Sequence, residues 1–121
     1  AKRIDSQRWN TEPGNIESAI SELIEHYEAE STLILNLLEQ TNKGESFINS
    51  LTEQGRIYHR KWVERCFGQY ILNSRVDTID ALAVSTDIYI YKLLRLDLKR
   101  SKKSTVNVIS RIVRGILKEK K

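Results

Sequence analysis

Apolar residues recur at intervals of three and four along much of this 121-residue chain, and this spacing constrains its fold more than any other feature. The clearest stretch, Asn15–Thr41, places Ile16, Ile20, Leu23 and Tyr27 on one helical face. The chain has one proline and only five glycines, too few for the many tight turns of an all-β protein. The sequence therefore predicts an all-α fold, a helical bundle.

The predicted helices have recognisable ends. Asn15 is a good N-cap for the first helix, because its side chain can accept a hydrogen bond from a free backbone N–H group. Gly44 is expected to stop that helix, since glycine can adopt the left-handed conformation of a helix C-terminus. Gly55 interrupts the apolar stripe of the second helix and is expected to kink or split it. Asp77 and Ser104 are expected to cap later helices. These further helices are predicted over Ser46–Asn73, Thr78–Val84 and Ser104–Lys118.

The charges are unevenly distributed along the chain. Residues 12–53 contain nine acidic residues and one basic residue, a net charge of −8. Residues 92–121 contain eleven basic and two acidic residues, a net charge of +9. A segment this basic is typical of a surface that binds phosphate. The alternative, that both segments are simply solvent-facing sides of helices, stays open at this level.

Residues that catalysis or metal binding would need are scarce. Cys66 is the only cysteine, which excludes an internal disulfide and the usual zinc sites, and it is expected to be a small buried side chain. His26 and His59 lie far apart, and neither has a partner at metal-ligand spacing. We expect no enzyme activity, no metal and no cofactor. With no signal peptide and no long apolar run, the sequence predicts no membrane association and a cytoplasmic location.

The charge distribution and the predicted helix breaks divide the chain into three segments. Residues 1–14 are predicted to be a basic N-terminal arm, and residues 15–74 an acidic helical hairpin for packing or dimerisation. Residues 75–121 are predicted to be a basic helix-turn-helix-like DNA-binding region with a terminal amphipathic helix. Two apolar surfaces are candidates for a homodimer interface, the Ile16–Leu38 seam and the Val106–Leu117 stripe. Packing inside the chain is the alternative for both.

The stretch Arg75–Lys103 has the layout of a helix-turn-helix. A short apolar segment precedes the polar break Ser85-Thr86-Asp87, and a longer segment starting at Ile88 ends in a basic run. Either Ala83 or Ser85 suits the turn position, so two registers are possible. Tyrosine and arginine can contact base edges or phosphates, and lysine contacts chiefly phosphates. The candidates for contacts with double-stranded DNA are Thr86, Tyr89, Tyr91, Lys92, Arg95, Lys99, Arg100, Lys102 and Lys103.

The segment Ile88–Leu98 also allows a second interpretation. The stretches 87–91 and 94–99 alternate apolar residues with polar or aromatic ones, which is strand periodicity. A strand followed by the last helix would suggest a ribbon-helix-helix protein. That fold needs a further helix, for which the sequence after Lys118 has no room. A helix over Ile88–Leu98 is therefore the favoured prediction.

Several short motifs between Trp62 and Arg100 occur in the order found in a known family. They are Trp62-Val63-Glu64-Arg65, Tyr70-Ile71, Leu82-Ala83-Val84-Ser85, Tyr89 and Lys92-Leu93-Leu94-Arg95. With these motifs, about a third of the chain resembles the C-terminal part of phage-encoded late-gene transcriptional regulators of the ArpU and RinA type. The resemblance implies a helical N-terminal region and a C-terminal helix-turn-helix similar to that of sigma factors. It also implies sequence-specific DNA binding and activation of transcription.

The sequence leaves two hypotheses for function. The first is a sequence-specific, non-enzymatic, DNA-binding transcriptional regulator, whose basic C-terminal third contacts phosphates. The second is a helical adaptor subunit of a nucleoprotein complex, in which the acidic Ile16–Leu38 seam binds a protein. In that second case Tyr89 and Tyr91 can stack on the bases of single-stranded RNA. Salt-sensitive binding to duplex DNA would favour the first hypothesis.

Overall fold

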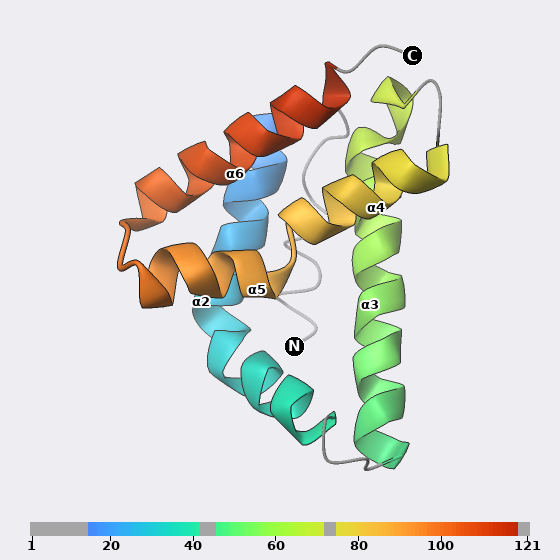
Figure 1. The fold of residues 1–121 in the computed structure, drawn as a ribbon, viewed down its shortest axis with the longest axis vertical. Helices are drawn as coiled ribbons and strands as arrows, with labels where there is room; N and C mark the ends of the chain where they lie inside the picture. Colours follow the sequence, from blue (N-terminus) through green and yellow to red (C-terminus); the bar gives the residue numbers. More distant parts are fainter. Residues whose placement is uncertain (1–14, 42–45, 72–74, 119–121) are drawn as a thin grey trace.

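The computed structural model describes residues 15–41, 46–71 and 75–118, and every regular element in these ranges is a helix. The predicted all-α helical bundle is confirmed. The predicted N-terminal arm and the helix stop at 42–44 lie outside the described residues. In chain order the elements are α2 (Ile16–Thr41), α3 (Ser46–Phe67), the 3-10 turn η1 (Gly68–Tyr70), α4 (Arg75–Ser85), α5 (Ile88–Tyr91), the π-helix η2 (Lys92–Asp97) and α6 (Lys102–Leu117) (Figure 1).

The helix α2 packs against α3, α5 and α6, and its N-terminal half supplies a large part of the core. Asn15 caps it as predicted, because Asn15 Oδ1 accepts a hydrogen bond from the Ser18 N–H group at 3.0 Å. In the predicted Ile16–Leu38 seam the second half is more open, and Leu33 is 57% exposed. Packing within the chain fully buries only the first half of the seam, at Ala19, Ile20, Leu23, Ile24 and Tyr27. In the second half, Ile34, Leu35 and Leu38 are partly buried against the same core.

The helix α3 is a single helix from Ser46 to Phe67, so the predicted split at Gly55 is wrong. Gly55 is exposed, and the cost of about 1 kcal/mol for a helical glycine is small enough for packing to override. The helix ends earlier than predicted, because a 3-10 turn follows and Ile71 has an extended backbone. Near its end, Trp62 is fully buried between the ring of His59 and the edge of Phe67.

The helix α4 begins at Arg75, three residues before the predicted start, so Asp77 lies in its first turn and is not its cap. Asp87 caps α5, because its Oδ2 accepts a hydrogen bond from the Tyr89 N–H group at 3.1 Å. The chain then continues from α5 into η2 without a break. The competing strand over Ile88–Leu98 is therefore wrong, and the helical prediction is confirmed for residues 88–97.

The helix α6 begins at Lys102, two residues before its predicted start. Its cap is Ser101, whose Oγ accepts a hydrogen bond from the Ser104 N–H group at 3.0 Å, so the prediction of Ser104 as the cap is wrong. The turn that leads into α6 contains Lys99 in the left-handed conformation, with φ 58°. The apolar stripe of α6 faces inward, and Ile109 and Val113 are fully buried.

One hydrophobic core joins α2, α3, α4, α5 and α6. The helix α6 crosses the N-terminal half of α2 and also packs on α4, while α4 packs on α3 (Figure 1). The predicted acidic segment 15–74 and the predicted basic segment 75–121 thus share one core. Among the described residues, no helix is long and apolar enough to cross a membrane.

Candidate nucleic-acid interface

Thr86 lies in the interior at the turn between α4 and α5, where it is fully buried. Its hydroxyl donates to the Leu82 carbonyl oxygen at 2.7 Å and shares a hydrogen bond with His59 Nε2 at 2.9 Å. Its own carbonyl oxygen accepts from the Tyr27 hydroxyl at 2.9 Å. The prediction that the Thr86 side chain faces outward is therefore wrong. Its polar groups are bonded to neighbouring helices, and leaving them unpaired in the interior would cost about 1–3 kcal/mol each.

Tyr91 is buried as well, so its predicted outward position is also wrong. Its ring packs on Tyr27, with centroids 5.3 Å apart, and its hydroxyl donates to Glu28 Oε2 at 2.5 Å. Burial, followed by this hydrogen bond, raises the pKa of Tyr91 to about 12. Burial by itself would raise the pKa of Glu28. The hydrogen bonds from Tyr91 and Arg95 outweigh that effect and lower the pKa of Glu28 below its usual value.

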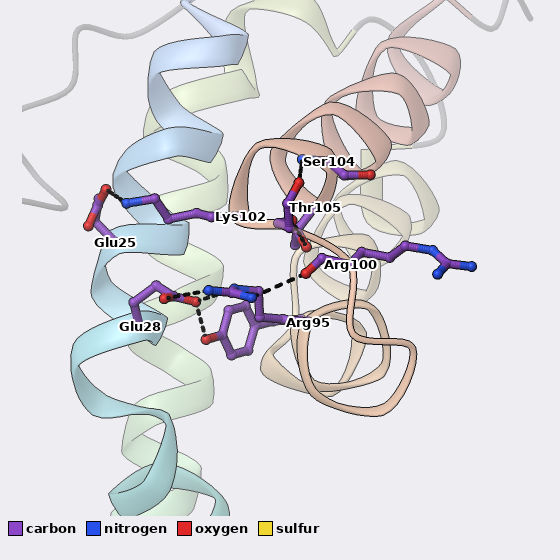
Figure 2. A network of polar contacts seen from close by, with 9 residues as sticks. Glu25, Glu28, Arg95, Arg100, Lys102, Ser104 and Thr105 are labelled. Carbon is purple, nitrogen blue, oxygen red and sulfur yellow. Dashed lines mark hydrogen bonds and ion pairs between the residues drawn. The ribbon is translucent and has the colours of Figure 1, made fainter.

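Basic residues of the C-terminal third pair with glutamates of α2. Arg95 Nε donates to Glu28 Oε2 at 2.9 Å, and Lys102 Nζ donates to Glu25 Oε2 at 2.6 Å (Figure 2). A third pair joins Arg114 to Glu17 at 3.3 Å. Such exposed ion pairs add little to stability, because solvent screens them. The two charged segments of the sequence therefore neutralise one another in part, and Arg95 and Lys102 are not freely available to a phosphate.

The outward side of α5 and η2 is more apolar than basic. Tyr89, Leu93 and Leu96 are each between 44% and 47% exposed there. Lys92 Nζ donates to both carboxylate oxygens of Asp97, at 3.1 and 3.0 Å, so its charge is locally balanced. The helix predicted to contact DNA thus presents few free cations.

Three of the predicted basic residues are exposed and have no carboxylate partner among the described residues: Lys99, Arg100 and Lys103. The Arg100 side chain points away from α2 in Figure 2, and its guanidinium donates only to the Leu98 carbonyl oxygen, at 3.1 Å. Tyr89 is also exposed, as is Lys102, which pairs with Glu25. Lys99, Arg100 and Lys103 lie on or next to the turn before α6. Tyr89 lies in α5, at the far end of the helical segment formed by α5 and η2.

The outward side of α6 carries Lys103, which was predicted, and three further residues that the sequence prediction missed: Asn107, Arg111 and Lys118. Lys103, Asn107 and Arg111 are spaced four residues apart and exposed, and Lys118 continues the same side two turns later. The three cations have no carboxylate partner in the described part of the chain, and the Asn107 side-chain amide has no hydrogen-bond partner there. The polar spacing of four was visible in the sequence, but which side of α6 is free depends on how the helix packs.

Gly115 lies on the same outward side, four residues after Arg111. A Cβ atom added at Gly115 would meet no heavy atom within 4 Å, and its backbone is helical with no left-handed φ. Nothing in the described structure therefore requires a glycine here. A helical glycine is unfavourable relative to alanine, and glycine is common where another backbone or a ligand comes close.

An open groove of roughly 560 Å³ runs between α2 and the first turns of α6. On the α2 side it is lined by carboxylates that include Glu22 and Glu25, and on the α6 side by Lys103 and Asn107. A polyanion is repelled from the α2 wall and attracted to the α6 wall. The basic side of α6 thus has an acidic border on its α2 edge. No cluster of His, Cys, Asp or Glu that could hold a metal ion occurs in residues 15–41, 46–71 and 75–118.

Comparisons with known proteins found no relative of this chain. No protein-family model matches the chain, and no curated protein or solved structure matches it significantly.

Proposed function

We propose that this protein binds double-stranded DNA through the outward side of α6 and the turn that precedes it. The observation that carries the proposal is a group of exposed cations on these two neighbouring segments, none of which has a carboxylate partner among the described residues. Neutralising phosphates with such cations releases counterions, which gives affinity for DNA of any sequence. The group consists of Lys99, Arg100, Lys103, Arg111 and Lys118.

The helix α6 suits this role better than α5 with η2. The turn Leu98–Ser101 is four residues long and contains a left-handed residue, Lys99, which is the position that glycine often occupies in a helix-turn-helix. The outward side of α6 is basic, whereas that of α5 and η2 is apolar. The DNA-contacting helix that we propose is therefore α6, which follows the helix predicted from the sequence. In this function the protein is a non-enzymatic, sequence-specific regulator of transcription.

The first experiment is fluorescence anisotropy of a labelled random-sequence DNA duplex, titrated with the protein at salt concentrations from about 50 to about 200 mM. If all five cations contact phosphates, the logarithm of the association constant falls with the logarithm of salt with a slope of about −4.5. The double variant Lys103→Gln/Arg111→Gln is expected to make that slope shallower by about two.

A matched control removes the same two charges elsewhere. The variant Arg56→Gln/Lys61→Gln loses one arginine and one lysine that are also exposed and unpaired in the described structure, but on α3. It is expected to keep the slope of the unchanged protein. No binding to duplex at low salt, or equal losses in the two double variants, would overturn the proposal.

A second candidate function draws on a different observation. The exposed apolar residues Tyr89, Leu93 and Leu96 form one outward side of α5 and η2, as expected for an adaptor that binds a protein partner. Titration of labelled single-stranded RNA in the same assay separates the candidates. Tighter binding to RNA than to duplex DNA supports a subunit of a nucleoprotein complex.

A further inference from the structure

We infer that α6 enters the major groove of the duplex and that Asn107 recognises an adenine there. This inference rests on the proposed DNA binding and adds to it the base that the surface selects. It comes from the arrangement of the outward side of α6, not from the charges alone.

Asn107 lies midway between two cations on one helical face. Lys103 and Arg111 are one step of four residues before and after it, which places successive Cα atoms about 6 Å apart along the helix axis. An α-helix fits into the major groove of B-DNA. In that position the flanking cations reach phosphates or guanines, and a side chain between them contacts the base edges. The cations on either side thus place the Asn107 amide in the groove.

The chemistry of Asn107 specifies the base. An exposed amide offers one acceptor and one donor side by side, which match the N6 amino group and the N7 atom of adenine. The Asn107 side-chain amide makes no hydrogen bond to any other described residue, so binding a base breaks no side-chain contact within the described part of the chain. A bidentate pair of this kind is worth about 1–3 kcal/mol of discrimination, or about 5- to 150-fold between adenine and another base.

Two neighbouring features agree with a duplex on this side of α6. Gly115 removes any side chain from the outward face two turns after Asn107, which allows the sugar-phosphate backbone to come close to the helix. On the α2 wall of the groove beside Lys103, Glu22 has no cationic partner among the described residues and repels phosphates, whereas Glu25 is balanced by Lys102. Because Lys103 and Asn107 line the α6 wall of that groove, the duplex is expected to reach them from the outward side of α6, where Arg111 and Gly115 lie, and not from within the groove.

The test starts with selection from a random-sequence duplex library by the full chain, followed by sequencing of the bound fraction. The unchanged protein is expected to enrich a site that contains a fixed adenine. Asn107→Ala is expected to lose about 5- to 150-fold of the preference for that adenine, while its affinity for the unselected library and its salt slope stay the same. The matched control is Asn36→Ala, which removes an exposed helical asparagine of α2 and should leave the preference intact.

A second measurement tests the predicted atom pair. Replacing the selected adenine by 7-deazaadenine removes the N7 acceptor and leaves the base pair intact. The substitution should weaken binding of the unchanged protein and have no effect on Asn107→Ala, because the variant has already lost the donor.

The outcomes separate this inference from the function on which it rests. If the unchanged protein does not bind duplex at all, the proposed function and the inference both fail. If it binds duplex but enriches no adenine, or if Asn107→Ala keeps the full preference, the inference fails and the DNA-binding function stands. Equal sensitivity of both proteins to 7-deazaadenine would also overturn it.

Discussion

Replacing Gly115 with alanine should make the protein more stable and its binding to DNA weaker. Gly115 lies in the interior of α6 on the exposed side, and an added Cβ would meet no atom within 4 Å. Alanine in a helix is favoured over glycine by about 0.5–1 kcal/mol, because the glycine backbone loses more freedom on folding. With no clash to subtract, the free energy of unfolding of Gly115→Ala should rise by that full amount.

Urea denaturation followed by circular dichroism measures this change, and the midpoint of thermal unfolding should rise by about 2–5 °C for a chain of this length. Gly55→Ala is the matched control, because Gly55 is also exposed, helical and free of contacts at the added atom. Both variants should gain similar stability. A loss of stability in Gly115→Ala alone would refute the helix geometry assigned to this part of α6.

The binding assay separates the two glycines. If the sugar-phosphate backbone lies against α6 at Gly115, the added methyl group must push it away, and the affinity of Gly115→Ala for a random-sequence duplex should fall. Gly55→Ala should bind as the unchanged protein does. A more stable Gly115→Ala protein with unchanged affinity for duplex would refute the close approach of DNA at this position.

Three further changes test the packing of α2 against α5 and the turn that precedes it. Tyr27→Phe removes the hydroxyl that donates to the buried Thr86 carbonyl oxygen, so it should lower the free energy of unfolding by about 1–3 kcal/mol in urea. Folding lowers the pKa of Glu28, so its carboxylate contributes to the free energy of unfolding above its unfolded pKa, near 4.5. That contribution is lost as the pH falls through the folded pKa. Glu28→Gln should therefore lack this acid-dependent loss of stability in urea. Folding raises the pKa of Tyr91 to about 12, so its contribution to the free energy of unfolding is complete below the unfolded pKa of 10.0. That contribution is lost as the pH rises toward 12. Tyr91→Phe should therefore show no such alkaline loss of stability in urea.

Much of the helical architecture follows from the sequence alone. The spacing of apolar residues correctly predicts α2 and its cap Asn15, the single helical class of the fold and the helical state of Ile88–Asp97. These predictions depend on local periodicity and on hydrogen bonds between residues three apart. Such interactions are present in the chain whichever way the helices pack.

Helix boundaries were harder to predict, because several residues near each end are chemically suitable caps. Ser101 and Ser104 are both good N-caps for α6. Ser101 is the one used, because the left-handed backbone at Lys99 turns the chain just before Ser101. Asp77 is likewise a good cap that lies inside the helix instead. Local chemistry offers the choices, and the path imposed by the core selects among them.

The candidate interface was decided by tertiary structure. Thr86 lies in a polar break and Tyr91 in an alternating stretch, yet both are buried, because α2 and α3 supply hydrogen-bond partners far away in the sequence. Arg95 and Lys102 pair with glutamates 67 and 77 residues distant, contacts that no local pattern encodes. The sequence by itself determined that a basic, helical end exists and that its polar residues repeat every four positions. Only the packing of α6 on α2 and α4 decided which of those residues face outward, because burial depends on the neighbours that the fold brings to each helix face.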